Sequence, residues 1–217
     1  GYGMGEHFAR GRSAEVFRTE DGKLLKLFFP DYPREYAEKE YENTKVAASL
    51  GCTGMQVYGM VERDGRFGFL MDFIDGVSQN DMPGKDPTYL FRAGKDLARC
   101  HVRVQEKRTR ELDDVREVCL AILEEECMAF LSPEEKKRCA AYLRSLPDED
   151  TVLHLDFHTG NVLVDKSGDC KIIDWMTAAR GSRAVEEALM EFFFSEAELF
   201  PEASKAKIAL FSAIRGS

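Results

Sequence analysis

Two carboxylates and one amide in the second half of the chain have the types and spacing of metal ligands. Asp156 and Asn161 are five residues apart in the segment HLDFHTGN, and Asp174 follows Asn161 by thirteen residues at the end of an apolar run. Oxygen ligands of this kind suit Mg²⁺, which takes few protein ligands and binds phosphate oxygens as well. Asp156, in the same loop, could orient a hydroxyl nucleophile. The pattern therefore indicates phosphate chemistry at a magnesium ion.

A β-hairpin is the element that must bring these ligands together. The apolar runs Asn161–Val164 and Cys170–Ile173 are typical of short strands, and Ser167-Gly168 predicts the turn between them. Such a hairpin folds Asp174 back toward Asn161.

The first half of the chain is predicted to be mainly strands. Apolar runs rich in β-branched and aromatic residues are interrupted by Asp21-Gly22 and Asp64-Gly65, and Asp-Gly between such runs is a strong hairpin signal. A charged segment over Arg34–Leu50 that stops at Gly51 predicts one helix. The order is therefore β-β-β-α-β-β. The two hairpins join Glu15–Glu20 to Lys23–Phe29 and Gln56–Val61 to Arg66–Met71.

The second half is predicted to be mainly helical. Apolar residues at helical spacing, and the N-cap Ser132 before Pro133, mark the helices. The predicted elements are helices over Thr88–Val104, Leu112–Leu131 and Ser132–Leu146, a strand over Thr151–Leu153, and further helices from about Arg183.

Composition and charge exclude several classes of protein. The 217 residues carry 30 Lys and Arg against 39 Asp and Glu, which gives a net charge of −9. Nucleic acid and anionic membranes are therefore not expected as partners, because phosphate contacts need clustered cations. No stretch approaches 18 uncharged apolar residues, so no membrane span is expected. The six cysteines form no CxxC pair and are expected to be reduced thiols of a cytoplasmic protein.

The segments His154–Asn161 and Ile172–Trp175 together resemble the catalytic loop and metal-binding Asp of protein kinase-like enzymes. Trp after the Asp is similar to the aminoglycoside phosphotransferase and choline kinase family of small-molecule kinases. The resemblance implies an α+β, two-lobed fold. Residues 1–75 would form an N-lobe of antiparallel sheet plus one helix, and residues 76–217 a mainly helical C-lobe with short catalytic hairpins.

The resemblance also implies an activity and its cofactors. The enzyme would transfer the γ-phosphoryl group of ATP (or GTP) to a hydroxyl group of a small molecule. Asp156 would be the catalytic residue, and Asn161 and Asp174 would hold Mg²⁺. His158 lies two residues after Asp156, where a phosphate-binding role and a structural role are both open.

Residues of the first half would hold the nucleotide in this resemblance. Gly11 and Ser13 lie in the loop between the first two strands, where the family covers the phosphates. Lys26 on the third strand would bind the α- and β-phosphates, with Lys23 as a competitor. Glu40 on the helix would pair with that lysine, with Glu42 as a rival.

The segment Met71–Ile74 matches the hinge between the lobes, where backbone groups of Asp72 and Ile74 would contact adenine. Two alternatives stay open beside the small-molecule kinase. One is a nucleotide-binding relative without catalysis. The other is a protein kinase, which would need an Ala-Pro-Glu segment and a large helical lobe after Asp174 that this sequence lacks. The identity of the acceptor and the oligomeric state are not indicated by the sequence.

Overall fold

The computed structural model describes residues 6–11 and 13–188 of the chain. They fall into two compact units. Unit 1 comprises Gly1–Arg103 and Asp156–Met176, and unit 2 comprises Val104–Leu155 and Thr177–Ser217. The predicted lobe boundary at residue 75 lies within unit 1. This boundary stays a prediction.

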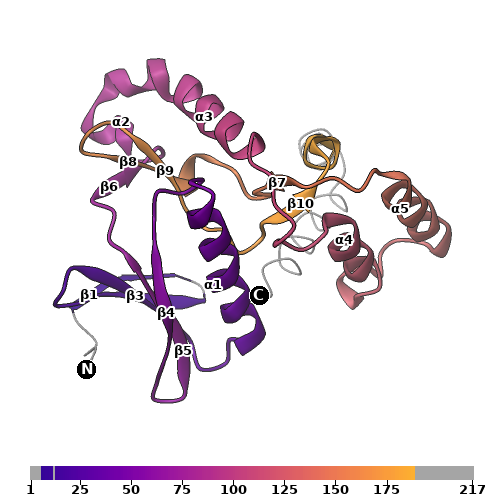
Figure 1. The fold of residues 1–217 in the computed structure, drawn as a ribbon, viewed down its shortest axis with the longest axis horizontal. Helices are drawn as coiled ribbons and strands as arrows, with labels where there is room; N and C mark the ends of the chain where they lie inside the picture. Colours follow the sequence, from indigo (N-terminus) through magenta and orange to yellow (C-terminus); the bar gives the residue numbers. More distant parts are fainter. Residues whose placement is uncertain (1–5, 12, 189–217) are drawn as a thin grey trace. The chain divides into compact units, whose positions relative to one another are not determined.

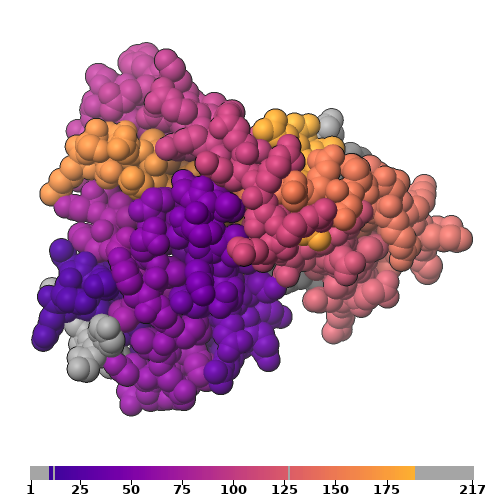
Figure 2. Space-filling view, viewed as in Figure 1, coloured from indigo at the N-terminus to yellow at the C-terminus, as the bar shows by residue number. Residues whose placement is uncertain are grey.

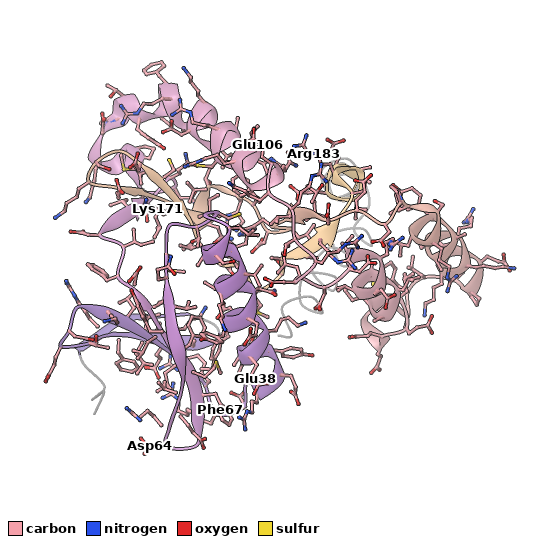
Figure 3. The ribbon with its side chains drawn as sticks, in the orientation of Figure 1. Glu38, Asp64, Phe67, Glu106, Lys171 and Arg183 are labelled. Carbon is pink, nitrogen blue, oxygen red and sulfur yellow. The ribbon has the colours of Figure 1, made fainter. Side chains whose placement is uncertain are left out.

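Unit 1 contains an antiparallel sheet of five strands in the order β1-β2-β3-β5-β4 (Figure 1). Its strands are β1 (Glu6–Arg10), β2 (Ala14–Arg18), β3 (Lys23–Phe28), β4 (Val57–Arg63) and β5 (Arg66–Asp72). Both predicted hairpins are present. Asp64 and Gly65, at the tip of the β4–β5 hairpin (Figure 3), have positive φ of 52° and 73°, as a two-residue turn of this kind requires.

Strand β5 can lie beside β3 only because residue 68 is a glycine. A Cβ atom at Gly68 would stand 2.2 Å from the Lys26 carbonyl oxygen, which is too close for any side chain. The pairing register places Leu27 opposite Gly68 and Lys26 opposite Phe69. Gly68 therefore helps to fix the register of β3 against β5, and with it the position of Lys26 along the sheet.

Helix α1 (Arg34–Ser49) packs on one face of this sheet. Its Ala37 joins Phe28 and Phe69 in a buried cluster. The helix ends where the sequence predicts, because Gly51 adopts a positive φ of 75° that few other residues tolerate. Figure 2 shows the outer side of α1 at the surface. The exposed charged residues of α1 include Glu38, Lys39, Glu42 and Lys45.

The rest of unit 1 is built around a three-stranded sheet in the order β6-β8-β9. Strands β8 (Val162–Asp165) and β9 (Cys170–Ile172) form the predicted hairpin, and β6 (Gly76–Ser78), which the sequence did not predict, pairs with β8. Lys171 marks β9 in Figure 3. The remaining elements are helix α2 (Met82–Lys85), the 3₁₀ turns Pro87–Tyr89 and Thr159–Asn161, and helix α3 (Leu90–Gln105), most of which lies in unit 1.

Unit 2 contains the two-stranded sheet of β7 (Thr151–Leu153) and β10 (Ala179–Gly181), with helices α4 (Val115–Leu123) and α5 (Pro133–Ser145). Leu153 of β7 and Ala179 of β10 pack with Val115 of α4. Residues 183–188 are helical, and the predicted helices beyond them lie outside the described residues. Arg183, near Glu106 in Figure 3, donates to the Gln105 carbonyl.

The predicted helix over Leu112–Leu131 is wrong in extent. Asp114 is the N-cap of α4, and its carboxylate accepts a hydrogen bond from the Arg116 backbone N–H at 2.9 Å. The helix stops at Leu123, where three glutamates follow in succession. Carboxylates are unfavourable at the negative end of a helix dipole. A 3₁₀ turn over Glu126–Met128 follows instead.

The helix predicted after Ser132 is confirmed. Ser132 and Glu135 form a reciprocal capping box at the start of α5. Among the residues that the structure describes, no helix is both long enough and apolar enough to cross a membrane.

Candidate functional site

The loop between β7 and β8 holds Asp156 and Asn161 against each other. Asn161 Nδ2 donates to the Asp156 backbone carbonyl at 2.9 Å and to its carboxylate Oδ2 at 3.2 Å. Both side chains are buried. Because the amide nitrogen faces Asp156, the amide oxygen of Asn161 points to the opposite side and could bind a cation.

His158 has a clear structural contact in this loop. Its Nδ1 accepts a hydrogen bond from the Gly160 backbone N–H at 3.0 Å and so caps the 3₁₀ turn. Its Nε2 lies 3.6 Å from Asp156 Oδ1 and 3.1 Å from Asn161 Nδ2. The His158 side chain is 52% exposed. Its role toward phosphate stays a prediction.

Two further contacts that the sequence did not reveal support the loop. The ring of His101 on α3 stacks on Phe157, with centroids 4.7 Å apart. His101 is half-buried against this residue, which follows Asp156 in the chain. Thr159 donates from its hydroxyl to the Asn80 side chain.

Asp174 is the second residue after β9, and the residue between them, Ile173, pairs with the Asn161 segment. The Ile173 backbone N–H donates to the Asn161 carbonyl at 2.9 Å. Asp174 itself has a φ of 62°, a left-handed conformation that is uncommon outside glycine. Trp175 is fully buried, and its Nε1 donates to the Ile172 carbonyl at 3.0 Å across the turn. The hairpin thus brings the two predicted metal ligands together.

Lys26 and Glu40 form an ion pair, with Nζ 2.7 Å from Oε1. Their side chains are 22% and 4% exposed. Lys23, the competitor, instead pairs with Asp21 at the hairpin turn. Glu42, the rival to Glu40, is exposed on the outer side of α1. The geometry therefore favours Lys26 with Glu40, while their role toward nucleotide stays a prediction.

Negative charge exceeds positive charge around this pair. Burial lowers the pKa of Lys26, but the carboxylates of Glu40 and Asp174 outweigh burial and the pKa is raised. Burial raises the pKa of Glu40, with Asp174 acting in the same direction and Lys26 against it. Glu40 Oε2 is buried without a hydrogen-bond partner. Two carboxylates near a single ammonium group are a surrounding that a divalent cation would neutralise.

The donor set fits magnesium rather than zinc. Within the described residues, no group of three or more His, Cys, Asp or Glu side chains could hold a metal ion. Magnesium needs only one or two protein oxygens, with phosphates and water completing its shell. Asn161 and Asp174 supply oxygen donors of that kind from one hairpin.

The loop between β1 and β2 is closed on itself. The Gly11 backbone N–H donates to the Ala14 carbonyl at 2.9 Å, so it is already engaged. The Ser13 carbonyl accepts from the Phe29 N–H at 2.9 Å, and its half-buried side chain remains the candidate phosphate donor of this loop.

The predicted hinge follows β5. The Asp72 N–H donates to the Gln56 carbonyl at 3.0 Å, and its carboxylate accepts from the Gln56 N–H and the Tyr58 hydroxyl. The Ile74 carbonyl accepts from the Gly76 N–H. The Asp72 carbonyl and the Ile74 N–H are therefore the hinge groups that could face a nucleobase.

Comparison with known proteins identifies the family. A model described as the phosphotransferase enzyme family matches residues 5–206. A search of curated proteins finds no match to the sequence.

Solved structures of aminoglycoside phosphotransferases share the fold. A thermostable mutant of APH(4)-Ia in its apo form has a TM-score of 0.63 at 14% identity, with 97% of this chain and 78% of that chain covered. Its ternary complex with ADP and hygromycin B has a TM-score of 0.63 at 14% identity, covering 98% and 79%. The aminoglycoside phosphotransferase of Alicyclobacillus acidocaldarius has a TM-score of 0.52 at 16% identity, covering 98% and 74%.

At these identities the likeness to solved structures establishes the fold, and the family model establishes the family. The predicted α+β, kinase-like fold and the predicted enzyme class are both confirmed. With 202 of its 217 residues inside the family match, this chain belongs to the phosphotransferase enzyme family.

Proposed function

We propose that the protein transfers the γ-phosphoryl group of ATP to a hydroxyl group of a small molecule. One observation carries the proposal. Three distant segments of unit 1 meet around one group of charges: the Lys26–Glu40 pair lies close enough to Asp174 for the carboxylate to raise the Lys26 pKa. Asp174 in turn follows a residue that is hydrogen-bonded to Asn161. A phosphoryl-transfer enzyme needs these charges in one place.

Asp156 is the proposed catalytic residue. Its carboxylate would accept or orient the proton of the acceptor hydroxyl. The Asn161 amide holds Oδ2 of this carboxylate at 3.2 Å, and so fixes its direction. His158 Nε2, on the Oδ1 side, would add a second polar neighbour there.

Asn161 and Asp174 would hold Mg²⁺, which supplies neutralisation of the charge on the β- and γ-phosphates when it is bound. Lys26 would bind the α- and β-phosphates, with its direction fixed by Glu40. Ser13, the loop at Gly11 and His158 would add contacts to phosphate. The Asp72 carbonyl and the Ile74 N–H would bind the nucleobase, and either adenine or guanine fits this pair of groups.

The solved relatives support ATP and a small acceptor. They include complexes with ADP and hygromycin B, with AMP-PNP and hygromycin B, and with streptomycin and ATP. In this proposal residues 1–75 serve as the nucleotide lobe and residues 76–217 as the acceptor lobe. A cytoplasmic location is proposed from the cysteines, since those that the structure describes are free thiols.

The experiment that tests this function is ADP release with a panel of hydroxyl compounds. Aminoglycosides, choline-like amines, sugars and amino-alcohols would be offered with ATP and Mg²⁺. At least one is expected to give acceptor-dependent ADP. Asp156→Ala should lower kcat by at least about 100-fold, the low end for a positioned acid–base group, while nucleotide binding persists.

Asp169→Ala is the matched control, because Asp169 is an exposed aspartate of the β8–β9 turn. It is expected to keep wild-type turnover. Unchanged turnover in Asp156→Ala would contradict the catalytic assignment. Nucleotide binding without ADP release from any acceptor would favour the non-catalytic alternative.

A further inference from the structure

Two contacts hold the segment after Asp174, one from helix α1 and one from Tyr32, two residues before the helix begins. Asn43 Nδ2 donates to the Met176 backbone carbonyl at 3.1 Å, and the Tyr32 hydroxyl donates to the Met176 sulfur at 3.2 Å. Asn43 and Met176 are both buried. Loss of the amide donor would therefore leave a carbonyl group buried without this hydrogen bond, which is costly.

The same side of α1 also reaches the nucleotide lysine. Asn43 follows Glu40 by three residues, and residues at that spacing lie on one face of a helix. Glu40 pairs with Lys26, and Asn43 binds the Met176 carbonyl. Figure 1 shows α1 extending from the five-stranded sheet toward β9. The helix thus connects the lysine of one predicted motif to the metal-binding turn of another.

The turn at Asp174 has a conformation that needs support. Its φ of 62° lies in the left-handed region, which non-glycine residues adopt in only a few per cent of cases, aspartate and asparagine more often than most. Such a residue keeps its conformation only when the surrounding structure holds it. Trp175 Nε1 closes the turn toward Ile172, and Asn43 holds its far side at Met176.

We propose that Asn43 is a positioning residue for the metal site. By holding the Met176 carbonyl, it keeps Asp174 in the conformation that binds Mg²⁺ beside the nucleotide. Tyr32 reinforces the contact through the Met176 side chain. The inference rests on the proposed function, because it assumes that Asp174 is a metal ligand.

The test is a Mg²⁺ titration followed by Trp175 fluorescence. Trp175 is the only tryptophan of the chain and stands between Asp174 and Met176, so its emission reports the turn directly. Protein with saturating ATP is titrated with Mg²⁺. Asn43→Ala is expected to raise the half-saturating Mg²⁺ concentration by about tenfold or more, as for residues that orient metal ligands. Its affinity for ATP without Mg²⁺ should stay unchanged.

Thr44→Val is the matched control. Thr44 is as buried as Asn43 on the same helix, and its hydroxyl donates only to the Glu40 carbonyl within the helix. This variant is expected to lose stability without a shift in Mg²⁺ dependence. Asn43→Gln keeps an amide donor, so it should raise the half-saturating Mg²⁺ concentration less than Asn43→Ala does. The proposal would be overturned if Thr44→Val or Asn43→Gln raised the half-saturating Mg²⁺ concentration as much as Asn43→Ala does.

Tyr32→Phe provides the test if Asn43→Ala does not fold. It removes only the hydroxyl from a half-buried ring and should raise the Mg²⁺ requirement in the same direction. A folded Tyr32→Phe protein with wild-type Mg²⁺ dependence would then refute the positioning role. If the wild-type protein itself gives no Mg²⁺-dependent signal with ATP, the proposed function fails instead. The two failures are therefore distinguishable.

Discussion

At the scale of single residues, the alternation of side chains along strand β3 places its two lysines on opposite faces of the sheet. Side chains of Lys26 and Phe28 point to one face, and Phe28 packs there with Ala37 of α1. Lys23 shares its parity with Leu25 and lies on the opposite face, beside the hairpin turn. Only Lys26 can therefore meet Glu40.

This difference predicts distinct effects of the same substitution. Lys26→Met should raise the Kd for ATP by about tenfold or more, because a charge-assisted hydrogen bond contributes about 1.5–3 kcal/mol. It should also lower Tm, since the buried Glu40 carboxylate would lose its ion-pair partner. Lys23→Met should leave the Kd within about twofold. Isothermal titration of both variants checks this, and similar losses of affinity would contradict the assignment.

The carboxylate of Asp174 is expected to account for the metal dependence of nucleotide binding. Asp174→Ala should abolish the increase in ATP affinity that Mg²⁺ causes and leave metal-free binding in place. Asp174→Asn keeps the volume and tolerates the positive φ, so it controls for distortion of the turn and should still weaken the Mg²⁺ effect. Trp175 fluorescence measures both variants. A normal Mg²⁺ effect in Asp174→Ala would exclude Asp174 as a ligand.

At the scale of elements, charge at the helix ends decides where α4 begins and ends. Asp114 caps the first turn and pairs with Arg116, whose guanidinium lies 2.7 Å from Oδ2. The hydrogen bonds from Arg116 lower the pKa of Asp114 against the effect of burial. Apolar spacing alone ran the predicted helix too far in both directions, because it ignores these end effects.

The cap predicts a graded loss of stability. Asp114→Ala should destabilise the protein by about 1 kcal/mol more than Asp114→Asn, because asparagine keeps the capping acceptor. Asparagine loses the charge and one of the two oxygens that accept from Arg116. Since the folded pKa of Asp114 is lowered, its charge contributes stability above its ordinary value of 3.8, and this is lost as the pH falls through the folded value.

Urea unfolding at several pH values measures both effects. The difference between wild type and Asp114→Asn should shrink as the pH falls below 3.8. Equal stability of the Ala and Asn variants at neutral pH would show that the cap contributes nothing.

At the scale of the whole molecule, all the site residues singled out here belong to unit 1. The loop with Asp156 and the residue Asp174 belong to this unit, although they follow α4, α5 and β7 of unit 2 in the chain. Binding of Mg²⁺ and ATP should therefore stabilise unit 1 directly.

The expected shift follows from linkage. At a ligand concentration of 100 Kd the gain is about 2.7 kcal/mol, which corresponds to about 5–10 °C in Tm for a chain of this length. Thermal melting followed by Trp175 emission reports unit 1, and circular dichroism reports the whole chain. A Trp175 transition that Mg²⁺ and ATP leave unmoved would contradict a nucleotide site in unit 1. ATP with EDTA is the control.

The sequence by itself determined the features that rest on neighbouring residues. Asp-Gly turns specify both hairpins, Gly51 ends α1, and Ser132 with Glu135 starts α5, because each acts within one turn of backbone. Asp156, Asn161 and Asp174 likewise come together through a local loop and a local hairpin.

Only the tertiary structure decided which distant groups meet. Strands β6 and β10 are each three residues long. They form only because β6 pairs with β8 and β10 pairs with β7, so no local sequence pattern predicts them. The choice of Glu40 over Glu42 depends on which side of α1 faces the sheet. The contact of Asn43 with Met176 joins residues 133 positions apart. A buried asparagine on a charged helix gives no sign in the sequence of which carbonyl it will bind, because that partner is set by packing rather than by its neighbours in the chain.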